Sequence, residues 1–220
     1  TTVNNVETLA AVPHIIVRGA GWYKGLVMGS PKSPGTKLIS VCGHVQKPGN
    51  YEITLGFPMK DLVFELAGGI RPGRTLKAVI PGGSSVPIMS AAEVEDCPTD
   101  YENIQANGSM LGSGGMIVMD DSTDMVYQIW RLAKFYAHES CAQCTQCREG
   151  TAWTTKVLER ILAGKGKTED LDLLLDLSEN MTGKTICVLS DSCAAPVVSG
   201  IQKFRSEFEA YISKAQKPAL

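Results

Sequence analysis

The alternation of hydrophobic and polar positions predicts strands in the middle of the chain. Two strand-like runs flank the turn sequence KPGN at residues 47–50, as in a β-hairpin. The segment MKDLVFELAGG at 59–69 has helical spacing and ends in paired glycines, which stop helices. A further strand over residues 76–80 runs into a glycine turn. Together these elements predict a small α+β domain of antiparallel type over residues 35–119.

From residue 120 onward the hydrophobic positions recur at helical spacing, which predicts a helical domain over residues 120–220. We expect four amphipathic helices, beginning at Asp124, after Gly150, after Thr168 and near Pro196. Trp153 is expected to face inward from the second helix. Four such helices with short connections are enough for a bundle. Residues 1–34 contain several glycines and prolines and one short apolar stretch, and we interpret them as a connecting segment.

Composition and charge exclude several classes of partner. The chain has 220 residues, 44% hydrophobic and 20% charged, with a net charge of -2, so it offers no broad basic surface for a nucleic acid. No apolar run reaches the roughly 20 residues that span a bilayer, and we expect no direct membrane insertion. The amino terminus lacks the pattern of a secretory signal. Because the sequence begins at Thr1 without a methionine, we interpret it as a processed or partial chain.

Clustered cysteines are the strongest chemical signal. Three of the seven cysteines lie at every third position of the segment HESCAQCTQCREG: Cys141, Cys144 and Cys147. This spacing lets one loop bind three corners of a four-iron cluster, which needs a fourth thiolate from elsewhere. The candidates are Cys187 and Cys193, with Cys42 and Cys97 less favoured because they lie in the other domain. Spacing alone does not choose between the first two.

Structural zinc is the alternative metal, because four thiolates also make an ordinary zinc site. Zinc sites usually pair two C-x-x-C segments, however, and a run of three cysteines with one remote partner favours iron and sulfur. His138 is interpreted as a surface or capping residue. Arg148 and Lys184 are candidate donors to an anionic cluster, or otherwise part of a solvated face. The glycine-rich segments 81–85 and 112–115 lack the lysine of a phosphate-binding loop, and we interpret them as turns.

Five separated motifs resemble, in order, the flavin- and NADH-binding subunit of respiratory complex I and the related diaphorase subunits of hydrogenases and formate dehydrogenases. These motifs are VNNVETLAAVP, AVIPGGSSVP, SMLGSGGMIVMDD, HESCAQCTQCREGT and GKTICVLSDSCAAPV. The resemblance implies a β-grasp domain of the SLBB type followed by the helical bundle. It also implies a [4Fe-4S] cluster whose ligands are Cys141, Cys144, Cys147 and Cys187. Cys193 would then serve in packing.

The resemblance also extends to the flavin. It implies that Asn4 and Asn5 are what remains of an FMN site, and that residues 1–34 belong to the end of the FMN-binding domain. The upstream glycine-rich domain that binds NADH and FMN is absent from these 220 residues, so we expect at best weak FMN binding and no NADH binding by this chain alone. The sequence departs from the family at Ala142, Gln146 and Ser190, where glycine, proline and glycine are usual.

The implied function is electron transfer within an NADH:quinone oxidoreductase, from FMN through the cluster to partner iron–sulfur subunits. The expected partners are a [2Fe-2S] thioredoxin-like subunit and a large iron–sulfur subunit, in a complex peripheral to the inner membrane on its cytoplasmic or matrix side. No side chain is expected to act as an acid, base or nucleophile. Two alternatives are a diaphorase subunit of an NAD-linked hydrogenase or formate dehydrogenase, and a non-catalytic binding module with structural zinc.

Overall fold

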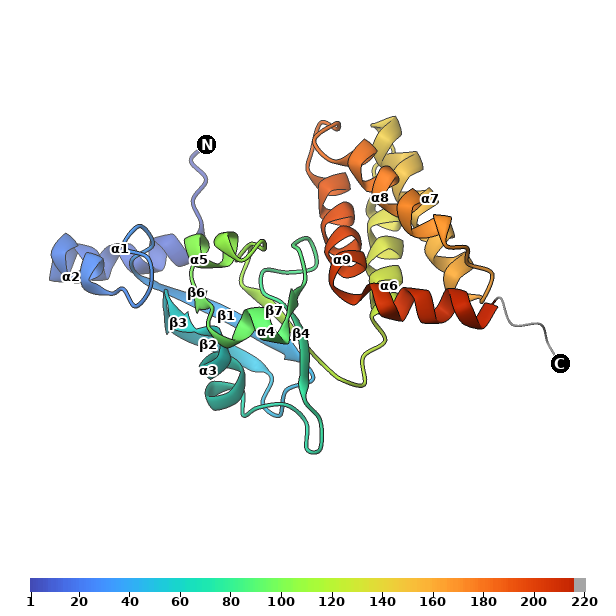
Figure 1. Ribbon diagram of the computed structural model, residues 1–220. Coiled ribbons are helices and arrows are strands. Elements are labelled where there is room, and N and C mark those ends of the chain that lie inside the picture. The colour runs from blue at the N-terminus through green and yellow to red at the C-terminus, as the bar shows by residue number, and fades with distance from the viewer. Residues whose placement is uncertain (216–220) are drawn as a thin grey trace. The chain divides into compact units, whose positions relative to one another are not determined.

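The computed structural model describes residues 1–215 and divides the chain into two compact units (Figure 1). The first unit contains residues 1–82 and 91–120, and the second contains residues 83–90 and the chain from residue 121 onward. Each unit has its own buried hydrophobic residues. The two units are therefore described one at a time.

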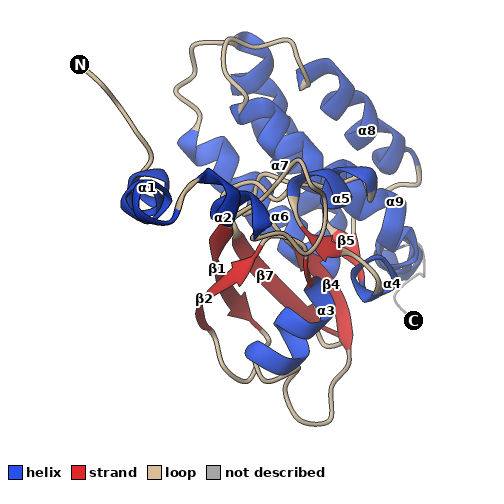
Figure 2. Ribbon diagram, turned by 90° about the vertical axis from the view of Figure 1, so that its left-hand side faces the viewer, coloured by secondary structure: helices blue, strands red, loops and turns tan. Residues whose placement is uncertain are grey.

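A sheet forms the centre of the first unit, with its strands in the order β2-β1-β7-β4 (Figure 2). The strands are β1 (Thr36–Gly43), β2 (Gly49–Thr54), β4 (Leu76–Ile80) and β7 (Gly115–Asp120). β1 and β2 pair antiparallel, with Ser40 opposite Asn50, which confirms the predicted hairpin. The expected antiparallel type holds for the β1–β2 and β4–β7 pairs but not for β7 and β1, which pair parallel. That pairing joins segments far apart in the chain, beyond the reach of local sequence patterns.

Short elements lie between these strands in the chain. α3 (Met59–Asp61) continues into the π-helix η1 (Leu62–Leu66), where a helix was predicted, and the chain then turns through Gly68 and Gly69 with positive φ. Leu62 and Val63 are fully buried on its inner face. The remaining short elements of this unit are β3 (Phe57–Pro58), α4 (Ala91–Glu95), β6 (Pro98–Thr99) and α5 (Tyr101–Ala106).

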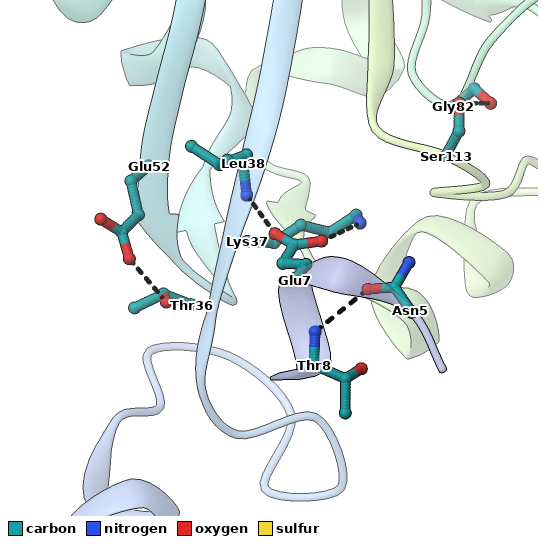
Figure 3. Close-up of polar contacts among 9 residues, drawn as sticks. All are labelled: Asn5, Glu7, Thr8, Thr36, Lys37, Leu38, Glu52, Gly82 and Ser113. Carbon is teal, nitrogen blue, oxygen red and sulfur yellow. Dashed lines mark hydrogen bonds and ion pairs between the residues drawn. The ribbon is translucent and has the colours of Figure 1, made fainter. Parts of the chain in front are cut away.

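The segment that was interpreted as a connection contains two helices, α1 (Val6–Arg18) and α2 (Ala20–Gly25). Asn5 caps α1, because its side-chain oxygen accepts a hydrogen bond from the Thr8 amide at 3.0 Å. Glu7 ties α1 to β1, accepting from the Leu38 amide at 2.6 Å and from Lys37 Nζ at 3.2 Å (Figure 3). No residue of α1 is buried. The Asn5 cap stabilises the start of α1, and the Glu7 contacts connect this helix to β1.

The second unit is a four-helix bundle, as predicted. Its helices are α6 (Met125–Glu139), α7 (Thr145–Leu162), α8 (Glu169–Met181) and α9 (Leu189–Ala215). Each helix packs on its neighbour in the chain, and α9 closes the bundle against α6. Residues 83–90, which include β5 (Met89–Ser90), belong to this unit: the Ile88 amide donates to Ser199 Oγ at 2.9 Å.

Two of the predicted helix starts were wrong. α7 begins at Thr145, before Gly150, so Gly150 lies inside the helix. A Cβ at this glycine would come within 2.5 Å of the Met181 side chain, so its absence lets α7 and α8 approach closely. The predicted inward position of Trp153 was also wrong, since this side chain is 51% exposed.

α9 begins at Leu189, well before Pro196, which therefore lies inside the helix rather than at its start. The helix is kinked further along, at Phe204. α8 begins after Thr168 as predicted, but the Thr168 side chain makes no capping bond; Asp170 instead accepts from the Lys167 amide at 2.9 Å. Among the described residues, no helix combines the length and the apolar character that crossing a bilayer requires.

Candidate metal centre

Two loops of the bundle carry the cysteines of interest. The first joins α6 to α7 and contains Cys141 and Cys144, while the second joins α8 to α9 and contains Cys187. Because successive helices of an up-and-down bundle run in opposite directions, both loops lie at the same end of it (Figure 1). Cys147, the third cysteine of the run, lies in the first turn of α7.

The two loops touch through a hydrogen bond to sulfur. The amide of Ile186 donates to Cys144 Sγ across a distance of 3.4 Å. Ile186 immediately precedes Cys187, so this bond joins the segment of three cysteines to the neighbourhood of the fourth. Cys141 and Cys187 are exposed, Cys144 is partly exposed and Cys147 is 7% exposed.

The most buried thiol of the run has a hydroxyl beside it. Ser140 Oγ lies 3.2 Å from Cys147 Sγ and also accepts a hydrogen bond from the Ala142 amide at 3.3 Å. Cys144 and Cys147 lie at the amino-terminal end of α7, where first-turn amides and the helix dipole favour negative charge.

Hydrogen bonds within each loop fix its shape. Ala142 has a positive φ of 64°, and Arg148 Nη1 donates to its carbonyl at 2.8 Å. In the second loop the Gly183 amide donates to Asp191 Oδ1 at 2.9 Å, and the Thr185 hydroxyl donates to the Cys187 carbonyl at 2.8 Å. Arg148, expected as a possible donor to the cluster, thus supports the backbone of the first loop.

Lys184, the other cation considered, donates to Asn180 Oδ1 at 3.4 Å. His138 lies in the last turn of α6 and is exposed, as a surface or capping residue would be. The hydroxyl contact of Ser140 was not predicted from the sequence. Its only signal there is a serine placed directly before the first cysteine.

The other cysteines lie in packed or distant positions. Cys193 is fully buried in α9, and desolvation, with a smaller effect of nearby Cys147, raises its pKa to about 12. Cys97 is 2% exposed, and burial, together with the nearby Asp100 charge, raises its pKa to about 11. Cys42 lies in β1 and donates to the Met116 carbonyl at 3.3 Å. Cys97 and Cys42 both belong to the first unit.

The chemistry of the donor set fits a thiolate-bound cluster. Two contacting loops supply thiols, an amide donates to sulfur, and a helix amino terminus lies beside two of the cysteines. All seven cysteines are free thiols. Within residues 1–215, no three side chains of Cys, His, Asp or Glu are gathered closely enough to enclose a metal ion. The four sulfurs therefore do not converge on one point, although the two loops that carry them are in contact.

Asn4 and Asn5, the candidate flavin residues, are both exposed and directly precede α1. The side chain of Asn5 is engaged by the Thr8 amide (Figure 3). Its side-chain oxygen caps the helix, and asparagine is a common residue at such a position whether or not a ligand binds there.

Comparison with known protein families finds two consecutive matches along the chain. Residues 37–127 match the family model described as SLBB domain, and residues 127–211 match the one described as NADH-ubiquinone oxidoreductase-F iron-sulfur binding region. The second match contains all four candidate ligands, and also Cys193.

Curated relatives carry the same family name. The F subunit of NADH-quinone oxidoreductase in Rickettsia bellii is 48% identical over 96% of this chain, and the F 2 subunit of the Rhizobium meliloti enzyme is 49% identical over 99%. In both comparisons the chain spans about half, 51%, of the relative's length.

Solved structures of similar fold come from an NAD+-reducing [NiFe]-hydrogenase. Its air-oxidised form is 37% identical, with a TM-score of 0.84 over 96% of this chain and 35% of that one. The H2-reduced form is 36% identical, with a TM-score of 0.84 over all of this chain and 36% of that one. The two domain matches, their order and the relatives' shared name agree, and the chain belongs to the family of NADH-quinone oxidoreductase F subunits, of which it represents the SLBB domain and the iron–sulfur binding region.

Proposed function

We propose that the helical unit holds a [4Fe-4S] cluster on Cys141, Cys144, Cys147 and Cys187 and carries electrons within an NADH:quinone oxidoreductase. The observation that carries this proposal is the hydrogen bond from the Ile186 amide to Cys144 Sγ. It brings the segment around Cys187 against the run of three cysteines, which is the arrangement that a cluster with one remote ligand requires.

The choice of Cys187 over Cys193 is supported by burial and protonation. Cys193 is fully buried among the bundle helices, and its pKa of about 12 keeps it a neutral thiol at physiological pH. A metal ligand must be a thiolate, and ionising Cys193 at this position is costly. Cys187 lies in a loop, is exposed and follows an amide that already donates to sulfur. It is therefore the better fourth ligand.

Such a cluster, when bound, accepts and releases one electron at a time. The residues of this chain would do three things around it. Four thiolates would fix its position, and the Ile186 amide and the amino terminus of α7 would favour its negative charge. The exposed Cys141 and Cys187 would leave one side near the surface, where a redox partner can approach.

The wider role follows from the family. Electrons would come from FMN, bound chiefly by the part of the F subunit that these 220 residues do not include, with Asn4 and Asn5 at the edge of that site. They would leave to partner iron–sulfur subunits, a [2Fe-2S] thioredoxin-like subunit and a large iron–sulfur subunit. The complex would lie peripheral to the inner membrane, on its cytoplasmic or matrix side.

A second candidate is the diaphorase part of an NAD-linked hydrogenase or formate dehydrogenase. The fold similarity to an NAD+-reducing [NiFe]-hydrogenase favours it. The sequence favours the first candidate, because identity to the quinone oxidoreductase subunits is 48–49%, against 36–37% for the hydrogenase chains. Both candidates use the same cluster and differ in the electron acceptor.

Metal analysis of anaerobically purified protein tests the proposal. We expect about four iron and about four sulfide per chain and, after reduction with dithionite, the EPR signal of a reduced four-iron cluster. A colourless, EPR-silent protein with stoichiometric zinc would instead support the structural-zinc alternative.

Two matched variants test the ligand assignment. Cys187→Ser should lose most of the iron, since it removes the proposed fourth thiolate, whereas Cys193→Ser should keep nearly all of it. Iron content and circular dichroism of both variants provide the readout. The opposite pattern would show that Cys193 is the ligand.

A further inference from the structure

Ser140 places a hydroxyl group against the most buried thiol of the cysteine run. It is the residue at which α6 ends, and its Oγ lies 3.2 Å from Cys147 Sγ. Cys147 is 7% exposed, so little water competes for its sulfur. A hydrogen bond in such a position is stronger than one at the surface.

The direction of this hydrogen bond follows from the bonds around it. Ser140 Oγ already accepts from the Ala142 amide at 3.3 Å, which leaves its proton to be donated elsewhere. A thiolate has no proton and can only accept. With Cys147 ionised as a cluster ligand, the O–H group must therefore point toward Sγ.

We propose that the Ser140 hydroxyl donates a hydrogen bond to the Cys147 thiolate and thereby raises the reduction potential of the bound cluster. This inference rests on the proposed function, because it presupposes that Cys147 is a ligand. Reduction adds an electron to an anionic group whose charge is shared with its sulfurs. A donor at sulfur stabilises the reduced form more than the oxidised form, and the potential rises accordingly.

The sulfurs of the other three proposed ligands have different surroundings. Cys144 Sγ accepts from the backbone amide of Ile186 rather than from a side chain, and Cys141 and Cys187 are exposed to water. Ser140 is thus a side chain through which a single substitution can change the hydrogen bonding to a proposed ligand. It acts through Cys147 and is a positioning residue rather than a catalytic one.

The same hydroxyl also supports the loop. By accepting from the Ala142 amide it helps to hold Ala142 at its positive φ of 64°, a conformation that glycine adopts without strain. Removing the hydroxyl could therefore act through the sulfur or through the loop. Ala142→Gly separates the two effects, since it changes the conformational preference of the loop and leaves O–H···S intact.

An EPR-monitored redox titration of the cluster-loaded full chain tests the proposal. Ser140→Ala should keep its iron and shift the midpoint potential to more negative values. We expect about a tenfold change in the reduction equilibrium, which is about 59 mV for one electron. Ser140→Thr, which keeps the hydroxyl, should titrate near the wild type, and so should Ala142→Gly. Ser192→Ala is the matched serine control, because its hydroxyl donates to the Val188 carbonyl at 2.8 Å.

Three outcomes would overturn the proposal. The first is an iron-loaded Ser140→Ala protein with the wild-type potential. The second is an equal shift in Ala142→Gly, which would assign the effect to the loop. The third is loss of iron from folded Ser140→Ala and Ser140→Gly alike, because the hydroxyl would then be needed for assembly. A wild-type protein without iron would instead refute the proposed function itself.

Discussion

Two cysteines of this chain are almost completely buried thiols with strongly raised pKa values. Cys97 and Cys193 are buried, and their pKa values are raised to about 11 and about 12, so they stay protonated and pack as small apolar residues. Cys141 and Cys187 lie in exposed loops at one end of the bundle. The spacing of cysteines in the sequence identifies the run, whereas the burial that raises the pKa values of Cys97 and Cys193 depends on the three-dimensional structure.

The effect of burial on the pKa of Cys97 can be tested independently of the metal. Its ordinary pKa of 9.0 is raised to about 11 in the folded protein, mainly by desolvation. Between about pH 9 and 11 the unfolded chain loses this proton while the folded chain keeps it, so stability should fall as pH rises. Below about pH 9 the contribution is fully present. Urea unfolding of the first unit, followed from about pH 8 to 11, should show a steeper fall for wild type than for Cys97→Ala.

Cys97→Ala will start from a lower stability, because it removes a buried side chain. The comparison is therefore made on the change in unfolding free energy with pH, not on its absolute value. Parallel pH profiles of the two proteins would show that this thiol ionises equally in both states.

At the scale of elements, the contact between β1 and β7 depends on a glycine. Gly43 lies opposite Val118 with a φ of 92°, and a Cβ there would overlap the Val118 carbonyl. The obstacle is backbone, which cannot rotate away as a side chain could. The parallel pairing of these strands thus requires a residue without a side chain at the end of β1.

Gly43→Ala should strongly destabilise the first unit. The positive φ costs about 1–3 kcal/mol and the overlap about 1–3 kcal/mol more. Gly73→Ala is the matched control, because Gly73 has a φ of 75° but no atom within 4 Å of the position that a Cβ would take. Urea unfolding should show the larger loss for Gly43→Ala. Equal losses would mean that backbone conformation alone accounts for the effect.

Local patterns predicted most of the elements but not all their boundaries. The hairpin and the existence of four helices followed from periodicity and turn residues. The start of α7 did not, because Gly150 suggested a loop and instead lies inside the helix, close to the Met181 side chain. α1 was also missed, since the prolines and glycines of its segment resembled a linker, and its helix is supported by the Asn5 cap and the Glu7 anchor.

At the scale of the molecule, the two units should respond differently to the metal. Binding of a cluster to the folded bundle adds its binding free energy to the stability of that unit. The first unit contains Cys42 and Cys97 but none of the proposed ligands. Loss of the cluster should therefore lower the stability of the second unit and leave that of the first unit unchanged.

Hydrogen exchange before and after anaerobic removal of iron measures this difference. Amides of residues 140–148 and 182–188 should lose the most protection, followed by the ends of the adjoining helices. Amides of β1 and β7 should exchange at the same rate in both samples. A comparable loss in the two units would contradict the assignment of the ligands to the bundle.

The sequence by itself determined most of the elements, the run of three cysteines and the family, because these depend on residue spacing along one chain. Only the tertiary structure decided which distant loop meets that run, which thiols are buried and how β7 pairs with β1. Those features depend on contacts between residues far apart in the chain. The Ile186–Cys144 bond joins residues 42 positions apart, and it forms because antiparallel helices return both loops to one end of the bundle.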